Sequence, residues 1–172
     1  MSSAIESANE VLAENYLSEP PINVYELAKN YGLDVIEVHF PASQDNISGF
    51  VTATDGTGKL YVNANEPPNR RRFTVAHELG HWRLHKEELQ TNPERSILFR
   101  IAIGQLNKDP IEREANIFAA NLLVPLDMLR KYKAGKTNAE LAKLFNVSAD
   151  VIGYRMKLLE SQPNVRTQQE NS

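Results

Sequence analysis

The sequence has no cysteine and only four histidines, and it has neither a net positive charge nor a long apolar run. Without cysteine, disulfides and thiolate zinc fingers are excluded, so any zinc ion must be bound by histidine, aspartate or glutamate. A formal net charge of −3 gives no overall argument for nucleic-acid binding. No apolar run approaches the ~18 residues of a membrane span, and the first residues lack the basic region of a signal peptide. We therefore expect a cytoplasmic protein with no membrane partner.

The 172 residues, 41% hydrophobic and 24% charged, have the composition of an ordinary soluble domain. Apolar residues recur at helical spacing in some stretches and alternate with polar residues in others. These patterns indicate an α+β fold in which a small antiparallel three-stranded sheet packs on helices. The predicted helices span residues 3–16, 22–32, 65–86, 110–125, 126–133, 138–145 and 149–160, and the predicted strands span residues 33–40, 47–54 and 59–64.

The stretches between these elements predict a turn, an irregular segment and a tail. The run "DGTG" between the last two strands predicts a hairpin, because glycine tolerates the positive φ needed there. Residues 87–110 have weak periodicity, so we expect an irregular segment with one short helix near residues 97–103. We expect a core over residues 1–125, a helical segment packed on it over residues 126–160, and a disordered polar tail over residues 161–172.

Three of the four histidines lie in "HELGHWRLH", which runs from His77 to His85. Residues i and i+4 lie one turn apart on the same face of a helix, so His77 and His81 can direct both imidazoles to one point. Two histidines at this spacing, with a glutamate beside the first, form the zinc-binding pattern of metalloproteases. The alternative is a pair of unrelated core or surface histidines. The location of the motif inside a predicted helix favours the metal site.

A catalytic zinc site needs a third protein ligand. The metzincin pattern HExxHxxGxxH would require glycine at Leu84 and histidine at Glu87, so it does not apply. His85 lies about 12 Å from His77 along a straight helix, which is too far for both to bind one ion. A carboxylate from the "EREAN" stretch is the remaining candidate for the third ligand, and we choose Glu112.

Helical geometry distinguishes the two glutamates of "EREAN". Glu112 and Asn116 lie one turn apart, so Glu112 can bind the metal while Asn116 hydrogen-bonds a neighbouring ligand. Glu114 projects about 200° away from Glu112 around the helix and is expected to face solvent.

The chemistry that fits these residues is peptide hydrolysis. A zinc ion in the site would polarise the peptide carbonyl and activate a water molecule. Glu78 need not bind the metal, and we predict that it accepts the proton of the water and passes it to the leaving amine. A donor to the developing oxyanion is also expected. His85, Tyr61 and Tyr154 are its candidates, and the sequence does not choose among them.

The strand "LYVNA" just before the motif helix is a candidate binding edge for the substrate. Zinc proteases commonly hold an extended substrate against an exposed strand edge through main-chain hydrogen bonds. Residues 61–63 could form this edge, and an ordinary strand within the sheet is the alternative.

The run "RFTVAHELGH", followed by "EREANIFAANLLVP", resembles the ImmA/IrrE family of metallo-endopeptidases. The likeness covers about residues 8–159 and includes "PINVYELAKNYGLDVI" near the start. This resemblance implies a minimal zincin-like domain with Zn²⁺ on His77, His81 and Glu112 and with Glu78 as the catalytic carboxylate. It also implies a substrate, a helix-turn-helix repressor whose cleavage relieves repression. The stretch between the two motif helices departs from the family pattern.

The last predicted helices, in "TNAELAKLFNVSADVIGYRMKLL", have the outline of a helix-turn-helix with Ser148 as the N-cap of the second helix. A DNA-reading version would present basic and amide side chains to the major groove. Here only Arg155 and Lys157 are basic, and Asp150 lies where it would repel phosphate. The pattern therefore favours core packing or substrate docking over DNA binding.

Two functional hypotheses follow from the sequence. The first is a zinc endopeptidase that cleaves a regulatory protein, for which the family resemblance implies a helix-turn-helix repressor.

 The second is a non-proteolytic protein- or DNA-binding regulator whose zinc site is structural or inactive. Glu78 discriminates between them, because a structural site has no use for a free carboxylate and usually closes with a fourth protein ligand. The sequence offers no evident fourth ligand.

Overall fold

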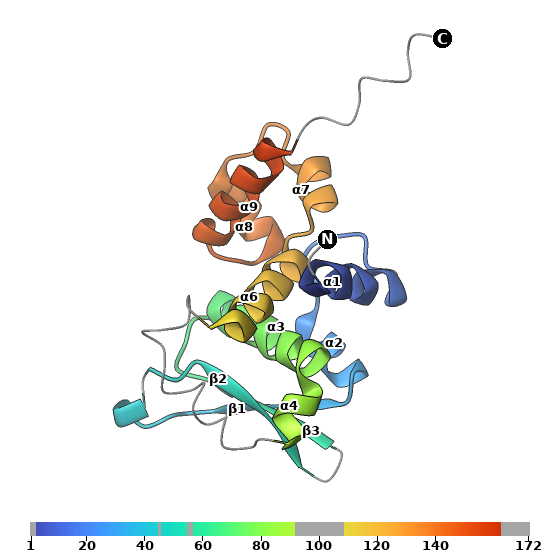
Figure 1. Cartoon of the computed structure of the whole chain (residues 1–172). Helices are drawn as coiled ribbons and strands as arrows, with labels where there is room; N and C mark the ends of the chain where they lie inside the picture. Colours follow the sequence, from blue (N-terminus) through green and yellow to red (C-terminus); the bar gives the residue numbers. More distant parts are fainter. Residues whose placement is uncertain (1–2, 45, 55–56, 92–108, 163–172) are drawn as a thin grey trace.

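The computed structural model describes residues 3–44, 46–54, 57–91 and 109–162 (Figure 1). A three-stranded sheet lies at one end of the molecule, helices α3 and α6 lie beside it, and α7, α8 and α9 lie at the other end. In chain order the elements are α1 (Ser3–Glu14), α2 (Val24–Asn30), β1 (Leu33–Val38), the 3-10 turn η1 (Ala42–Gln44), β2 (Gly49–Thr54), β3 (Thr57–Asn63), α3 (Pro68–Leu84), α4 (Lys86–Thr91), α6 (Pro110–Leu123), α7 (Leu126–Tyr132), α8 (Asn138–Phe145) and α9 (Ala149–Ser161).

The sheet is mixed, so the prediction of an antiparallel sheet is wrong. The strand order is β1-β3-β2, with β1 parallel to β3 and β2 antiparallel to it. The β2–β3 hairpin was predicted from the turn residues, but no local signal says which of its strands pairs with β1. Leu60 and Val62 of β3 are fully buried, as is typical of a central strand. Residues 61–63 therefore lie on the central strand, which is the alternative that the sequence left open, and β2 is an outer strand of the described sheet.

Helix α3, which carries the histidine motif, packs directly against α6. Gly80 allows this close approach, because a Cβ at this position would lie only 3.0 Å from the Phe118 ring. Trp82 belongs to the core, and its indole Nε1 donates a hydrogen bond of 3.0 Å to the Tyr31 carbonyl. These contacts fix the rotation of α3 about its axis and therefore the direction in which its histidines point.

The helices begin where the sequence supplies start signals. Pro68 occupies the first turn of α3, and Pro110 occupies the first turn of α6. The Asp109 side chain caps α6 by accepting a hydrogen bond of 2.9 Å from the Ile111 amide. The predicted N-cap of α9 is also present, since the Ser148 side chain accepts from a backbone amide in the first turn.

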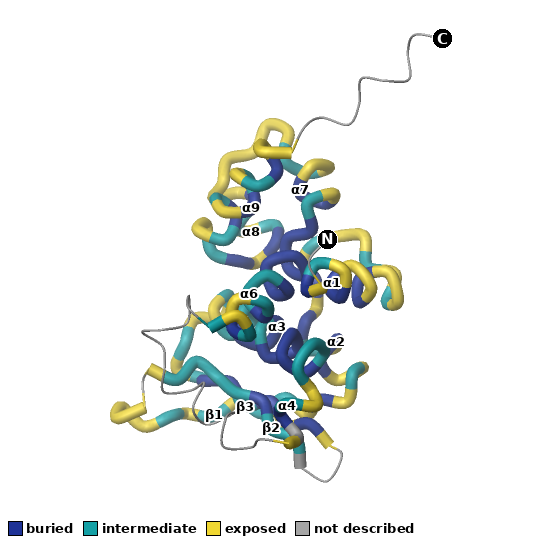
Figure 2. Tube along the Cα trace, viewed as in Figure 1, coloured by how far each residue is buried: buried dark blue, intermediate teal, exposed yellow. Residues whose placement is uncertain are grey.

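The last three helices share the hydrophobic core of the rest of the chain. Figure 2 shows buried positions that continue from the sheet through α3 and α6 into α8 and α9. Arg155 of α9 is only 1% exposed, and its guanidinium donates to the Val124 carbonyl and the Asn121 side chain, each at 2.9 Å. Burial lowers the pKa of Arg155 to about 10, which still leaves it charged at neutral pH. This arginine is therefore not available to contact DNA.

Two further predictions concern the connecting stretches. Helix α4 occupies the beginning of the segment that was expected to be irregular. The predicted short helix at residues 97–103 lies outside the described residues, and so does most of the predicted tail. The division between residues 1–125 and 126–160 stays a prediction. In the described part of the chain, no helix is long and apolar enough to cross a membrane.

Candidate metal centre

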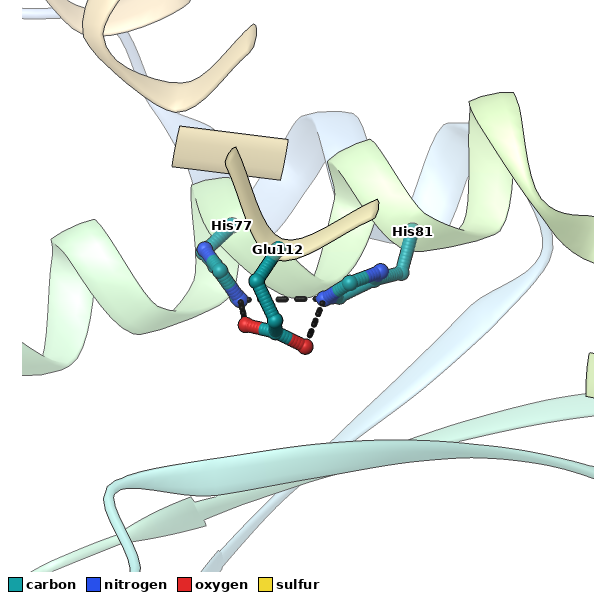
Figure 3. A group of neighbouring side chains, drawn as sticks. All are labelled: His77, His81 and Glu112. Carbon is teal, nitrogen blue, oxygen red and sulfur yellow. Dashed lines mark hydrogen bonds and ion pairs between the residues drawn. The ribbon is translucent and has the colours of Figure 1, made fainter. Parts of the chain in front are cut away.

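Three side chains from two helices converge on one point (Figure 3). His77 and His81 come from successive turns of α3, and Glu112 comes from the first turn of α6. The Nε2 atoms of the two histidines lie 3.0 Å apart. One carboxylate oxygen of Glu112 lies 3.1 Å from His77 Nε2, and the other lies 3.1 Å from His81 Nε2. The two helices thus bring together residues that are far apart in the sequence.

These distances fit the ligand shell of a zinc ion. Zinc–ligand bonds of about 2.0–2.2 Å at tetrahedral angles place neighbouring ligand atoms about 3.3–3.5 Å apart. The observed separations of 3.0–3.1 Å are close to that spacing. No fourth histidine, aspartate or glutamate joins this group within the described residues. The donor set therefore suits an ion with three protein ligands and one open position, as in catalytic zinc sites.

The electrostatics of the group depend on the shared carboxylate. Burial alone would lower the pKa of His77, but the hydrogen bond to Glu112 and the charges of Glu78 and Glu112 outweigh it and raise the pKa. Burial alone would raise the pKa of Glu112, but its contacts with His77 and His81 hold that pKa well below its usual range. Glu112 is therefore ionised at neutral pH, as a metal ligand must be.

The neighbouring residues Asn116 and Glu114 face in different directions. The Asn116 Oδ1 atom lies 3.0 Å from Nδ1 of His77. A proton on Nδ1 would be donated to Asn116, which leaves the Nε2 lone pair directed at the metal position. Glu114 is partly exposed and lies 3.5 Å from Nε2 of His85. Of the two glutamates in this helix turn, Glu112 is the one that faces His77 and His81.

A cleft of about 480 Å³ opens beside the three ligands. Glu78 lies in its wall, is 8% exposed, and is not one of the three converging ligands. Residues 47–51 at the start of β2, the first turns of α3, Leu89 of α4, the first turns of α6 and the corner between α8 and α9 form the rest of the wall. The residues that line the cleft are Ile47, Ser48, Gly49, Phe50, Val51, Asn69, Arg70, Phe73, Thr74, His77, Glu78, His81, Leu89, Glu112, Asn116, Val147, Ser148, Asp150 and Val151.

The three candidate oxyanion donors do not line this cleft in the part of the chain that the structure describes. Tyr61 lies on the central strand and stacks on Phe50, with ring centroids 4.7 Å apart. Tyr154 is 52% exposed on α9. His85 follows the last turn of α3 and lies beside Glu114. Strand order and helix rotation separate these side chains from the cleft, and neither is encoded in a local sequence pattern.

Sequence reasoning missed the cleft residues on β2, at the start of α3 and at the α8–α9 corner. One signal was present in the run "ISGF". A Cβ at Gly49 would lie 2.5 Å from the Tyr61 carbonyl oxygen and 2.5 Å from a Thr74 methyl group. Glycine in a strand often marks such a close approach. The other missed residues carry no comparable signal.

The fold and the site define a zincin-like metallopeptidase. The sequence model of the IrrE N-terminal-like domain, named Peptidase_M78, matches residues 28–157. The chain therefore belongs to the IrrE N-terminal-like peptidase family. It is a metalloendopeptidase, and its cofactor is Zn²⁺.

Two of three similar proteins carry the names of metal-dependent peptidases. Metallopeptidase ImmA of Bacillus subtilis (strain 168) is 27% identical over 147 residues, which cover 83% of this chain and 79% of the relative. The uncharacterized immunity region protein 2 of Bacillus phage phi105 is 30% identical over 75% of this chain and 73% of the relative. The radiation response metalloprotease IrrE of Deinococcus radiodurans is 33% identical over 56% of this chain, but only 30% of its own length is matched.

A solved structure has the same fold. A Mycobacterium tuberculosis transcriptional regulator superposes with a TM-score of 0.65 over 97% of this chain, at 18% sequence identity. The match covers 50% of that longer chain. At this level of identity the similarity concerns the fold alone.

Proposed function

We propose that this protein is a cytoplasmic zinc endopeptidase that cleaves a helix-turn-helix repressor and thereby relieves repression. The observation that carries the proposal is a three-ligand metal group with Glu78 beside it in an open cleft. The choice of a repressor is supported by the family and by two names among the relatives, an immunity region protein of a phage and a radiation response metalloprotease.

In this proposal each residue of the centre has one role. His77, His81 and Glu112 hold the zinc ion, and Asn116 fixes the ring orientation of His77. The bound ion supplies Lewis-acid activation of water and of the scissile carbonyl. Glu78 accepts the proton of the attacking water and delivers it to the leaving amine.

The substrate binds in an extended conformation along β2. One side of β2 pairs with β3, and residues 49–51 of β2 line the cleft. The main chain of an outer strand can pair with an added peptide strand. This assignment replaces the candidate edge at residues 61–63. A linker or a partly unfolded helix end of the repressor would adopt the extended form at the lowest cost.

The alternative is a regulator with a structural or inactive zinc site. A structural site would close with a fourth protein ligand, whereas the described residues supply three. A DNA-binding version would use basic residues of α9, but Arg155 is buried against α6. Both observations favour the endopeptidase over the regulator.

The test is incubation of the zinc-loaded protein with the repressor encoded nearest to it, with and without a chelator, followed by mass spectrometry. We expect one cut, in an exposed segment between the DNA-binding and oligomerisation parts. Such a cut weakens operator binding, because the two half-sites no longer act together. Glu78→Gln should leave the repressor intact while it still holds zinc. Intact repressor with the wild-type enzyme, or several scattered cuts, would overturn the proposal.

A further inference from the structure

One wall of the cleft comes from a part of the chain that is remote from the metal ligands. Val147, Ser148, Asp150 and Val151 lie at the corner between α8 and α9, and all four line the cleft. None of them belongs to the metal-ligand group. The helix-turn-helix outline of α8 and α9 thus contributes to the cleft of a peptidase. A side chain here can contact a substrate without taking part in the chemistry.

A half-buried arginine connects this corner to the helix that carries the histidines. Arg72 of α3 donates from Nε to the Asn146 carbonyl at 3.1 Å and from Nη2 to the Ile22 carbonyl at 2.8 Å. Asn146 ends α8 in the left-handed conformation, with φ of 53°. Burial lowers the pKa of Arg72, although the group stays charged at neutral pH. The corner is therefore held at a fixed position relative to α3 and its metal ligands.

Asp150 is the charged group that this corner presents to the cleft. Apart from Glu78 and Glu112, it is the only carboxylate among the described lining residues. It is exposed, and no hydrogen bond or ion pair of its carboxylate is found in the described ranges. The basic lining residue Arg70, by contrast, contacts Glu66 at 3.5 Å and Ser48 at 3.4 Å. Among the described lining residues outside the metal centre, Asp150 therefore contributes a negative charge that no described ion pair neutralises.

Apolar side chains lie on both sides of Asp150 in this wall. Val147 is buried and Val151 is half-buried, and both line the cleft. A substrate segment that passes the corner would meet an apolar surface interrupted by one carboxylate. The complementary segment carries an apolar residue beside a lysine or an arginine.

We propose that Asp150 is a specificity-determining residue that pairs with a basic side chain of the substrate, while Val147 and Val151 contact an adjacent apolar residue. This inference rests on the proposed function, because it describes the substrate of the same cleft. A structural role is the competing explanation for an aspartate at this position, because an acidic residue in the first turn stabilises a helix.

Asp127 provides a matched control for that competing explanation. It is the second residue of α7, as Asp150 is the second residue of α9, and it too is acidic in the first turn. Asp127 does not line the cleft, and it pairs with Arg130 on the surface. Substitution of either aspartate removes a favourable charge from a helix start, but only Asp150 is placed to contact the substrate.

The first measurement is peptide binding to the full-length, zinc-loaded Glu78→Gln protein, in which the peptides stay intact. Each short extended peptide contains one leucine. In each set of three peptides, one position beside the leucine holds lysine, serine or glutamate, and the rest of the sequence is the same. We expect the best lysine peptide to bind about fivefold more tightly than its glutamate counterpart, as an exposed ion pair allows. Asp150→Asn should abolish this preference and Asp150→Lys should reverse it, while Asp127→Lys leaves it unchanged.

The second measurement uses the repressor as substrate. With Asp150→Lys we expect KM to rise about fivefold at nearly unchanged kcat, and we expect replacement of the basic residue near the cut by glutamate to restore KM. Cleavage without a charge preference, or an equal effect of Asp127→Lys, would overturn the inference and leave the proposed function intact. If the peptides do not bind and the repressor is not cut, the proposed function fails and the inference fails with it.

Discussion

At the scale of single residues, the metal centre depends on one carboxylate shared by two imidazoles. Glu112 is 4% exposed, and each of its oxygens lies 3.1 Å from a histidine Nε2. A carboxylate buried this deeply is costly unless it has a positive partner. A zinc ion provides that partner when it is bound, and protonated histidine provides it when the ion is absent. Protons and zinc therefore compete for the same site.

The first consequence of this arrangement concerns metal content. We expect about one zinc ion per chain in the purified protein, lost on His77→Ala, His81→Ala or Glu112→Ala, because each removes one of three ligands. Glu78→Gln should retain the metal, because Glu78 is not in the ligand group. Elemental analysis after dialysis measures the content, with Glu114→Ala as the control on the same helix. Normal zinc in Glu112→Ala, together with its loss in Glu114→Ala, would contradict the assignment.

A second consequence concerns the stability of the metal-free protein. The pKa of His77 is raised above 6.5. The contribution of His77 to the free energy of unfolding is therefore complete below pH 6.5 and is lost as the pH rises through the raised pKa. The pKa of Glu112 is lowered below 4.5. The contribution of Glu112 to the free energy of unfolding is therefore present above pH 4.5 and is lost as the pH falls through the lowered pKa. Both contributions are complete between pH 4.5 and pH 6.5.

We therefore expect the difference in unfolding free energy between wild type and Glu112→Gln to be largest in that window. Urea unfolding in the presence of a chelator measures it. The difference should shrink as the pH rises above the pKa of His77. A difference that keeps growing above neutral pH would show that the His77–Glu112 pair does not contribute in this way.

The sequence predicted some residues of the centre better than others. His77 and His81 follow from local geometry, since an i, i+4 pair on a helix has only one relative placement. Glu112 required the further assumption that a second helix turns this face to the first. Asp150 was interpreted only as a residue that would repel DNA, because its place in the cleft depends on how α9 packs. Long-range packing of this kind has no signature in the residues themselves.

At the scale of elements, helices and the hairpin were predictable because each has a local cause. Helical periodicity, Pro68 and Pro110 near the starts of α3 and α6, and the glycines of "DGTG" all act within a few residues. The pairing of β1 with β3 has no such cause, because it joins strands from separate parts of the chain. For the same reason, the sequence could not show that residues 61–63, the candidate substrate edge, lie on the central strand.

Gly49 provides a test of this strand arrangement. A Cβ here would lie 2.5 Å from the backbone oxygen of Tyr61, which cannot move without disturbing β3. We expect Gly49→Ala to lower the free energy of unfolding by roughly 1–3 kcal/mol through overpacking. Gly153 is the matched control, because it lies in α9 with nothing within 4 Å of its added Cβ.

At Gly153, alanine should instead raise the stability by roughly 0.5–1 kcal/mol, because alanine has the higher helix propensity. Chemical denaturation of the two variants beside the wild type measures both effects. Equal stability of Gly49→Ala and the wild type would mean that β2 and β3 do not pair in the described register.

At the scale of the whole molecule, the C-terminal helices and the metal centre share one structural unit. Arg155 binds the end of α6, and α6 carries Glu112 in its first turn. Arg72 binds the corner of α8 and α9 from the helix that carries His77. The wall that we propose contacts the substrate is thus positioned by the same two helices that carry His77, His81 and Glu112. Access to the metal centre and recognition of the substrate are therefore structurally linked.

This linkage predicts low activity on generic unfolded proteins. In the proposed binding mode a substrate lies along β2, passes the α8–α9 corner and places its scissile bond at the metal centre, so contacts away from the reacting bond contribute to the rate. If those contacts are worth about 3 kcal/mol, casein should be cleaved on the order of a hundredfold more slowly than the cognate repressor. The measurement compares kcat/KM for the two substrates at equal zinc loading, with Glu78→Gln as the blank. Rapid casein digestion by the wild type that is absent in Glu78→Gln would mean that the cleft admits any extended chain, and the regulatory role would have to be abandoned.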